Sequence, residues 1–279
     1  ALWKLEEGSG AIALDTSAVG PTMNLALDGE VAWVSGGGLE FNGGKAWASA
    51  LDSRKLYNEL ASGSGTQAYT IETWLIPANT TQEGPARIIT YSGGTGERNF
   101  MLGQVMYNYV ARNRSINPEV NANGDPTFST ADADEDLQAN LQHVVLTYDQ
   151  ARGRRLFVNG VFTDDVDETA PDLLLNWDPN YRFALGNEVS NNRIWRGIVK
   201  MVAIYEDVMS EAVMMGLAPH IGRNLAHDVV YEACAKCADG GLTLRDVLLA
   251  DKRISANLSS LAHVLQVGVD VRCMTPRER

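Results

Sequence analysis

Short apolar runs separated by turn residues recur along the first 205 residues of the chain. Residues 69–76 show the pattern most clearly, because apolar and polar side chains alternate there. In an extended segment this alternation sends Ile71 and Leu75 to one face. It sends Glu72 and Trp74 to the opposite face. A period of two residues is typical of a strand with one buried face, so the pattern predicts a β-strand here.

Two further strands are predicted at 143–148 and 155–158, and the second leads into a tight turn at Asn159 and Gly160. Asn-Gly accepts the positive φ angles of a type I′ turn, which joins adjacent antiparallel strands. The sequence therefore predicts a hairpin over 157–162. Other apolar runs predict strands at 38–41, 86–92, 99–104, 107–114, 182–186 and 197–205.

The pattern changes between residues 205 and 220. All six Trp, all six Phe and eight of the nine Tyr precede this region. Beyond it, apolar residues recur three and four apart at 225–238 and 242–249, and a helix-cap pattern opens 210–215. We therefore predict an all-β domain over 1–205, built as a two-sheet antiparallel sandwich, and a helical C-terminal extension over 206–279.

Composition narrows the classes of partner. The 279 residues are 45% hydrophobic, enough for a sizeable core, and no run approaches the roughly 20 apolar residues of a membrane helix. The formal net charge is -12, and up to residue 206 the chain holds 26 acidic and 15 basic residues. Such a chain repels a phosphate backbone, so nucleic acid is not expected as a partner. Membrane insertion is not expected either, because the chain lacks a long apolar run. Ala1 opens the sequence and no signal-peptide pattern follows it, so we expect a processed or excised chain.

Six blocks of residues follow one another in a recognisable order: 2–10 with 14–17, 37–43, 69–74, 141–149, 156–160 and 197–205. Together they resemble the laminin G-like domains of the concanavalin A-like lectin and glucanase superfamily. The resemblance implies two curved antiparallel sheets stacked as a jelly roll. In many relatives the concave face holds a glycan and the rim often holds calcium. The resemblance covers about 1–205 and says nothing about the extension.

Two positions depart from the pattern of these relatives. Their penultimate strand often carries an acidic pair after Gly-Leu-Ile, whereas here Lys200 and Met201 stand at that place. Their early Asp-Ser-Ser-Gly-Asn-Gly turn is replaced by residues 15–20. Any calcium is therefore expected on loop carboxylates rather than on the penultimate strand.

An acidic loop supplies the candidate metal ligands Asp132, Asp134 and Asp136. Their carboxylates are spaced two residues apart, as in calcium loops. The loop lacks the Gly of an EF-hand turn and has no Glu at the twelfth position, so it is not an EF-hand. A solvated acidic loop without metal is the alternative interpretation.

Residues 98–114 supply what a glycan site needs, namely planar groups for stacking and polar side chains for hydrogen bonding. Asn108, Arg112 and Arg114 share one strand parity, so we expect them on one sheet face. Two Arg in an otherwise acidic domain are costly to bury, so they are expected to face water or an anionic ligand. The candidate ligand-binding residues are Asn99, Gln104, Asn108, Arg112 and Arg114, together with Arg193 and Trp195 in a predicted rim loop.

Catalytic chemistry has weaker candidates. Glycoside hydrolysis needs two carboxylates across one bond, and the Glu-x-Asp-x-x-Glu run that hydrolytic members of the superfamily often carry is missing from this sequence. Glu72 is the best lone carboxylate, and His143 is a lone general-base candidate. A structural role is the alternative for both.

All three cysteines fall in the extension. Cys234 and Cys237 form a Cys-x-x-Cys pair, and Cys273, His227 and His263 could in principle complete a zinc shell. Incidental thiols and a disulfide are the other interpretations. An odd count leaves at least one thiol unpaired or paired between chains.

The sequence therefore predicts a secreted or periplasmic module that recognises a glycan or another cell-surface ligand, with calcium as the one cofactor considered. A hydrolase on the same fold, acting on glycosidic or ester bonds, is the rival function. A structural adhesion domain without a small-molecule ligand is the third. The sequence names neither the ligand nor the oligomeric state.

Overall fold

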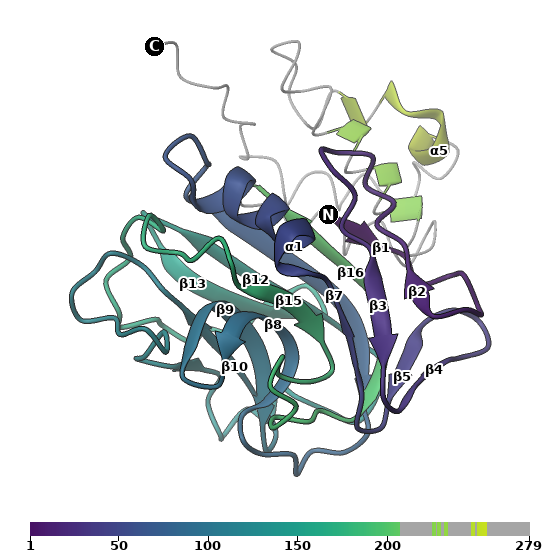
Figure 1. The fold of residues 1–279 in the computed structure, drawn as a ribbon, viewed down its shortest axis with the longest axis horizontal. Coiled ribbons are helices and arrows are strands. Elements are labelled where there is room, and N and C mark those ends of the chain that lie inside the picture. The colour runs from purple at the N-terminus through teal and green to yellow at the C-terminus, as the bar shows by residue number, and fades with distance from the viewer. Residues whose placement is uncertain (207–224, 227, 230–231, 234–246, 249, 256–279) are drawn as a thin grey trace. The chain divides into compact units, whose positions relative to one another are not determined.

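The computed structural model describes residues 1–206 and, beyond them, 225–226, 228–229, 232–233, 247–248 and 250–255 (Figure 1). The chain separates into two compact units. The first consists of Ala1–Val158 and Phe162–Met209, and the second of Asn159–Val161 and Ser210–Arg279. The candidate site described below lies in the first unit.

Short strands build two antiparallel sheets of eight strands each, and this confirms the predicted two-sheet sandwich. Sheet 1 contains β1 (Leu2–Trp3), β4 (Val31–Trp33), β5 (Leu39–Phe41), β7 (Tyr69–Pro77), β12 (Gln142–Asp149), β13 (Gly153–Val158), β14 (Val161–Phe162) and β16 (Gly197–Tyr205). Sheet 2 contains β2 (Ile12–Ala13), β3 (Leu25–Asp28), β6 (Lys45–Trp47), β8 (Ala86–Gly94), β9 (Glu97–Val105), β10 (Asn108–Asn113), β11 (Phe128–Ser129) and β15 (Arg182–Leu185).

The strand order is β14-β13-β12-β7-β16-β5-β4 in sheet 1, where β1 also pairs with β16. In sheet 2 the order is β11-β10-β9-β8-β15-β6-β3-β2. Neighbours in each sheet are often far apart in sequence, as β7 and β16 are, so the sandwich forms by long-range pairing. Figure 1 shows β8, β9 and β10 side by side in sheet 2.

The core between the sheets is rich in aromatic rings. Tyr69 of sheet 1 lies 5.5 Å from Phe100 of sheet 2 and 5.6 Å from Tyr148, measured between ring centroids. Trp3 and Phe183 stack at 4.9 Å with an interplanar angle of 9°. Such pairs add roughly 0.5–1.5 kcal/mol each to the free energy of burial, so they fix how the two sheets meet.

Burial of the expected core aromatics is confirmed for three of the five. Trp3, Phe41 and Tyr148 are buried. The same expectation is wrong for Trp74 and Phe157, which are half-buried. Both have the strand parity that points outward from sheet 1, so the partner sheet cannot cover them.

The predicted hairpin joins β13 to β14. Asn159 has φ of 52° and Gly160 has φ of 80°, as a type I′ turn requires of both central residues. The prediction of this turn, which rested on two adjacent residues alone, is therefore confirmed.

A helix that the strand pattern did not predict follows β6. Helix α1 (Ala50–Leu56) is capped by Ser49, whose hydroxyl accepts a hydrogen bond from the backbone N–H of Asp52 at 3.1 Å. It continues into a π-helical turn at Tyr57–Ala61. A capping Ser followed three residues later by an acid is a helix-start signal, and it was present in the sequence.

Part of the C-terminal extension is described. Residues 225–226, 228–229, 232–233 and 247–248 are helical, within the ranges predicted as helix, and α5 (Lys252–Ser255) follows them. The predicted helix at 210–215 lies outside the described residues, as do Cys234, Cys237, Cys273, His227 and His263. Within the described part of the chain, every helix is too short or too polar to span a membrane.

A buried carboxylate, Asp15, holds the N-terminal segment to α1. Its Oδ1 accepts hydrogen bonds from the backbone N–H groups of Leu2 at 3.1 Å and Ser17 at 3.0 Å. Its Oδ2 accepts from the N–H of Met23 at 3.1 Å and from Nζ of Lys55 at 2.6 Å. Burial by itself would raise the pKa of Asp15, but the bonds from Lys55, Ser17 and Leu2 outweigh it and lower the pKa to about 2.

We expect Asp15→Asn to lower the free energy of unfolding by about 3 kcal/mol or more at neutral pH, because it leaves Lys55 buried without a carboxylate. Because the folded pKa of Asp15 lies below its ordinary value of 3.8, the stabilisation is present above that value and is lost as pH falls toward about 2. Urea unfolding of both proteins between neutral and acidic pH measures this. A difference between them that does not shrink with acidity would contradict the role given to Asp15.

Candidate functional site

One row of residues crosses the outer face of sheet 2. Cross-strand pairing aligns Trp47, Ala184, Thr90, Met101 and Arg112, one each from β6, β15, β8, β9 and β10. The alternate residues of these strands, such as Tyr91 and Phe100, pack in the core between the sheets. Ala184, Thr90 and Met101 are nevertheless fully buried, so other parts of the chain must cover the outer face.

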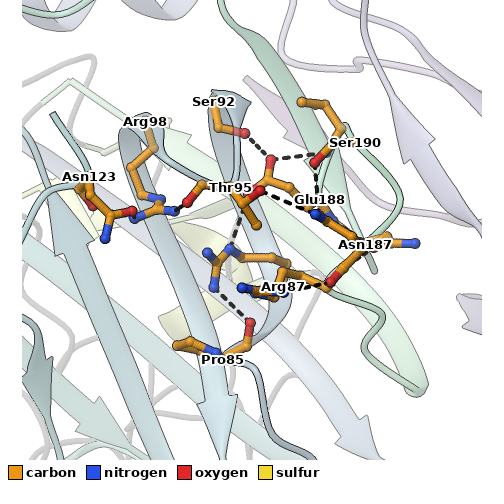
Figure 2. Close-up of polar contacts among 12 residues, drawn as sticks. Pro85, Arg87, Ser92, Thr95, Arg98, Asn123, Asn187, Glu188 and Ser190 are labelled. Carbon is orange, nitrogen blue, oxygen red and sulfur yellow. Dashed lines mark hydrogen bonds and ion pairs between the residues drawn. The ribbon is translucent and has the colours of Figure 1, made fainter.

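The first cover is the loop 186–196, which Glu188 fastens to the sheet (Figure 2). The Glu188 side chain is fully buried and forms an ion pair with Arg87, whose Nε lies 3.2 Å from Oε2. The hydroxyl of Ser92 and the N–H of Val189 both donate to Oε1 of Glu188. In the middle of the loop, Nζ of Lys45 contacts Oδ1 of Asn191 at 2.5 Å.

The second cover is the loop 121–125. Nη1 of Arg98 donates to both the backbone carbonyl and the side-chain carbonyl of Asn123 (Figure 2). Nη1 of Arg112 lies 2.9 Å from Oδ1 of Asp125. Although burial would raise the pKa of Asp125, hydrogen bonds from Asn123 and Asn121 and the charge of Arg112 lower it, so this carboxylate is ionised. We call 121–125 and 186–196 the roof loops.

Four arginines, Arg87, Arg98, Arg112 and Arg193, form what we call the arginine cluster. Arg193 belongs to a roof loop, and its Cδ packs 3.1 Å from the position that a Cβ on Gly84 would occupy. Burial, followed by the charges of Arg87 and Arg112, lowers the pKa of Arg98 to about 9. Burial likewise lowers the pKa of Arg87 to about 10 and that of Arg112, while Glu188 and Asp125 respectively oppose the change. Like charges within the cluster therefore add to the effect of burial on these three arginines, and Arg87 and Arg98 remain charged at neutral pH.

The comparisons with known proteins agree with this architecture. A laminin G family model, described as "Concanavalin A-like lectin/glucanases superfamily", matches residues 42–213. That span is more than half of the chain.

The chain belongs to the concanavalin A-like lectin/glucanases superfamily.

Solved structures with the same fold as this superfamily member include neurotoxin binding domains. The binding domain of botulinum neurotoxin serotype D/C has a TM-score of 0.55 and 13% sequence identity, over 81% of this chain and 51% of that chain. The binding domain of botulinum neurotoxin DC in complex with rat synaptotagmin II has a TM-score of 0.56 and 12% identity, over 81% and 50%. This chain therefore spans about half the length of those structures. Identity this low shows a shared fold and nothing more.

A different family model, described as the adenylosuccinate lyase C-terminus, matches residues 208–268. Short stretches of the chain are also similar to two curated proteins. An uncharacterized protein of Schizosaccharomyces pombe is 44% identical over 52 residues, which is 19% of this chain and 12% of that protein. Trans-aconitate decarboxylase 1 of Mycosarcoma maydis is 47% identical over 51 residues, 18% of this chain and 10% of that enzyme. The chain thus matches only about a tenth of either protein.

Two of the predicted ligand residues on β9 and β10 are buried in hydrogen bonds of the fold. Asn99 exchanges two hydrogen bonds with the backbone of Asp178, at 2.9 and 2.8 Å. Nδ2 of Asn108 donates to Oδ1 of Asp132, and its Oδ1 accepts from the Thr130 hydroxyl at 3.4 Å. Both amides fix neighbouring loops to the strands.

Gln104 and Trp195 bond to each other in the interior. Nε1 of Trp195 donates to Oε1 of Gln104 at 2.9 Å, and Nε2 of Gln104 donates to the backbone carbonyls of Asn79 and Met106. Both side chains are fully buried. The expected rim position of Trp195 is therefore wrong, because the indole packs within the core, 6.5 Å from the ring of Phe41.

Arg112 and Arg114 are half-buried, so the expectation of an exposed pair of arginines is also wrong. The Arg112 side chain is 16% exposed and carries the ion pair with Asp125. Arg114 lies one residue beyond the end of β10, and its Nη1 donates to the hydroxyl of Tyr181 at 3.2 Å. The structure thus gathers Arg112 and Arg193 into the arginine cluster and leaves Arg114 outside it.

Sequence reasoning missed Arg87, Arg98 and Glu188 as members of this site. Register shifts in the pairing of β8 with β9, between Arg87 and Ile89 and around Ser92, break the alternation that would have placed them. The one signal of this site in the sequence was the excess of arginines on β8, β9 and β10 in an otherwise acidic chain.

The two weak catalytic candidates lie together on the outer face of sheet 1. Nε2 of His143 is 2.9 Å from Oε1 of Glu72, and the Tyr205 hydroxyl donates to Oε2 of Glu72 at 2.6 Å. The ring of Trp74 lies 4.7 Å from that of His143, measured between centroids. Glu72 and His143 are both buried, which is the environment of a structural pair.

In the predicted calcium loop, Oδ1 of Asp132 accepts a hydrogen bond from Nδ2 of Asn108. Burial and the charges of Asp165 and Asp134 raise the pKa of Asp136. Among the residues that the structure describes, no three Asp, Glu, His or Cys side chains converge on a common point suited to a metal ion. Calcium binding at Asp132, Asp134 and Asp136 stays a prediction.

We expect Glu188→Gln to lower the free energy of unfolding by about 3–5 kcal/mol, because it leaves Arg87 buried without a charge partner. The matched control is Asp149→Asn, which removes a carboxylate from a pair whose Arg152 side chain is 55% exposed. Exposed pairs contribute about 0–1 kcal/mol, so the control should unfold almost as the wild type does. Urea unfolding of the three proteins makes the comparison, and equal effects of the two substitutions would contradict the anchoring role of Glu188.

Proposed function

We propose that the β-sandwich is a carbohydrate-binding module that recognises its glycan on the outer face of sheet 2, beside Arg112 and Arg193. The observation that carries this proposal is the arginine cluster. Four guanidinium groups are concentrated on one sheet face of a chain with a net charge of -12. Two of them, those of Arg112 and Arg193, keep part of their side chains exposed and can reach a ligand. Guanidinium forks bind carboxylate and sulfate groups in two-point contacts and donate to sugar hydroxyls.

An aromatic ring on the same face supports a sugar ligand. Trp47 is half-buried and stands in the same cross-strand row as Arg112. Nζ of Lys45 lies 5.6 Å from the centroid of its ring, and the Arg182 guanidinium lies 5.4 Å from it. Carbohydrate sites combine such flat apolar surfaces with a few fixed polar groups.

The comparisons support the class of function in a general way. One neighbouring structure concerns the entry of botulinum neurotoxin type C through interaction with two ganglioside molecules, and another holds the DC binding domain with SialylT. These ligands belong to those proteins. For this chain we propose a glycan or cell-surface ligand, a site of action outside the cytoplasm, and calcium on the acidic loop as its one candidate cofactor.

The hydrolase alternative has one specific observation in its favour, the contact between Glu72 and His143. Two features favour the binding module instead. The pair is buried, and it lies on sheet 1 rather than on the face that carries the arginine cluster. Release of reducing sugar or of acetate from a panel of glycans would support the alternative if Glu72→Gln abolished it.

We expect Arg112→Ala to weaken retention of the protein on its glycan at least ten-fold, because a charge-assisted hydrogen bond at the contact surface is lost. A glycan array run with and without calcium finds the glycan and tests the metal, and an affinity gel then measures retention. Arg196→Ala is the control, because Arg196 is exposed in the same roof loop as Arg193. Equal retention of both variants and the wild type would remove this face from the proposal.

A further inference from the structure

Four buried polar atoms on the outer face of sheet 2 lack hydrogen-bond partners among the residues that the structure describes. They are Oγ1 of Thr90 and the Nε atoms of Arg98, Arg112 and Arg193. Thr90 and Arg98 are fully buried, so bulk water does not reach these two. Buried N–H and O–H groups are satisfied in the great majority of cases, and each exception needs a cause. Four exceptions on one sheet face point to a missing partner that accepts hydrogen bonds.

The charges on this face do not balance either. The arginine cluster carries four positive charges, and the ion pairs of its members are with Glu188 and Asp125. Among the residues that the structure describes, two positive charges therefore remain uncompensated, that of the buried Arg98 and that of the half-buried Arg193. An uncompensated buried charge is strongly destabilising, so a bound anion would offset both the charge and the missing acceptors.

The unpartnered donors belong to two parts of the fold, the outer face of sheet 2 and the roof loop that covers it. Thr90 and Arg112 belong to one cross-strand row, and Arg98 lies opposite Ser92 in the next row of the same sheet. Neighbouring strands are about 4.8 Å apart, so the backbones of Thr90 and Arg112, with β9 between them, lie about 10 Å apart, a gap that an arginine side chain can bridge. Arg193 comes from the roof loop 186–196, and its backbone carbonyl accepts a hydrogen bond from the backbone N–H of Arg87 at 3.0 Å. Its charge lowers the pKa of Arg87 and Arg112.

We propose that the arginine cluster binds an oxyanion beneath the roof loops, with Arg98, Arg112 and Arg193 as its principal donors. The ligand chemistry is that of a sulfate, a phosphate or a carboxylate, which presents several acceptor oxygens and a negative charge to planar guanidinium groups. Water could satisfy the N–H groups but would leave the two charges uncompensated. A neutral sugar would likewise leave the two charges uncompensated.

The oxyanion can be a free ion or the charged group of an acidic glycan, such as a uronate carboxylate or a sulfate ester. As a statement about an oxyanion site the proposal stands alone, whereas as a statement about the glycan it rests on the proposed function. Trp47 and Arg112 are four strand spacings apart, about 19 Å, so an acidic glycan with its charged group in the arginine cluster would reach Trp47 with a ring several residues along its chain.

The site is tested by titrating sodium sulfate into the full chain in a calorimeter, at constant ionic strength. We expect saturable binding by the wild type and at least ten-fold weaker binding by Arg112→Gln and Arg193→Gln, because each loses a charged donor. Asp125→Asn should bind sulfate more tightly, because it removes the carboxylate that competes for Arg112. Arg196→Gln, in the same loop as Arg193 but exposed, should bind as the wild type does.

A conservative variant and a thermal measurement distinguish lost sulfate binding from lost folding. Arg98→Lys keeps the buried charge but loses the guanidinium donors, so we expect it to fold and to bind sulfate more weakly. Thermal unfolding gives a second readout, in which sulfate should raise the Tm of the wild type to a plateau. A rise that does not saturate and is equal in all the variants is the general salting effect of sulfate, and it would overturn the proposal.

Competition then separates the two sources of the oxyanion. Oligogalacturonate that displaces sulfate, while a neutral oligosaccharide of equal length does not, would assign the site to an acidic glycan. Sulfate binding that neither oligosaccharide disturbs would assign it to a free ion, and the oxyanion site would stand while the glycan ligand of the proposed function fails. No saturable sulfate binding by the wild type would overturn the oxyanion site, whatever the glycan array shows.

Discussion

The structure depends on the way sheet 2 is buried on both of its faces. Its inner face packs against sheet 1 through apolar and aromatic side chains, as any sandwich requires. Its outer face is covered by the roof loops, and a loop can cover a sheet only if the polar groups beneath it find partners. Glu188 provides them on one side by binding Arg87 and Ser92 at once. The shape of the candidate site follows from this one buried carboxylate.

Buried ion pairs recur at other points where irregular segments must be held. Asp15 and Lys55 join the N-terminal segment to α1, with nitrogen and oxygen 2.6 Å apart. Asp167 holds Arg154 at the same distance beside β13. Such pairs contribute little net stability compared with apolar side chains, but breaking one of them leaves a buried charge. In this fold they specify where loops lie on the sheets rather than how strongly the sheets pack.

The arginine cluster differs from these pairs because it is not balanced. Where Asp15 and Asp167 each meet one cation, four guanidinium groups share two carboxylates. A protein that needed only to fasten its loops would have no use for the extra charges. The imbalance is the physical reason for looking for a ligand on this face rather than at Glu72 and His143, where one carboxylate contacts both the histidine ring and the Tyr205 hydroxyl.

The local periodicities could be recognised from the order of residues alone. Alternation at 69–76, the Asn159-Gly160 turn and the aromatic composition up to residue 205 were sufficient for an all-β sandwich, because these signals depend on neighbours within a few residues. The sequence also showed that arginines concentrate on the strands around residue 112. It carried the capping signal of α1 as well, although a helix inside a strand-rich region went unpredicted.

Which side chains meet depends on how distant segments pack in the folded chain. The pairing of β8 with β9 contains register shifts, so parity counted along one strand could not place Arg87 or Arg98. Burial of Asn99, Gln104 and Trp195 depends on segments tens of residues away, such as the backbone at Asp178. Glu188 reaches Arg87 across 101 positions of sequence. Contacts at that separation depend on how the loops fold back over the sheet, and they cannot be predicted from the pattern of neighbouring residues.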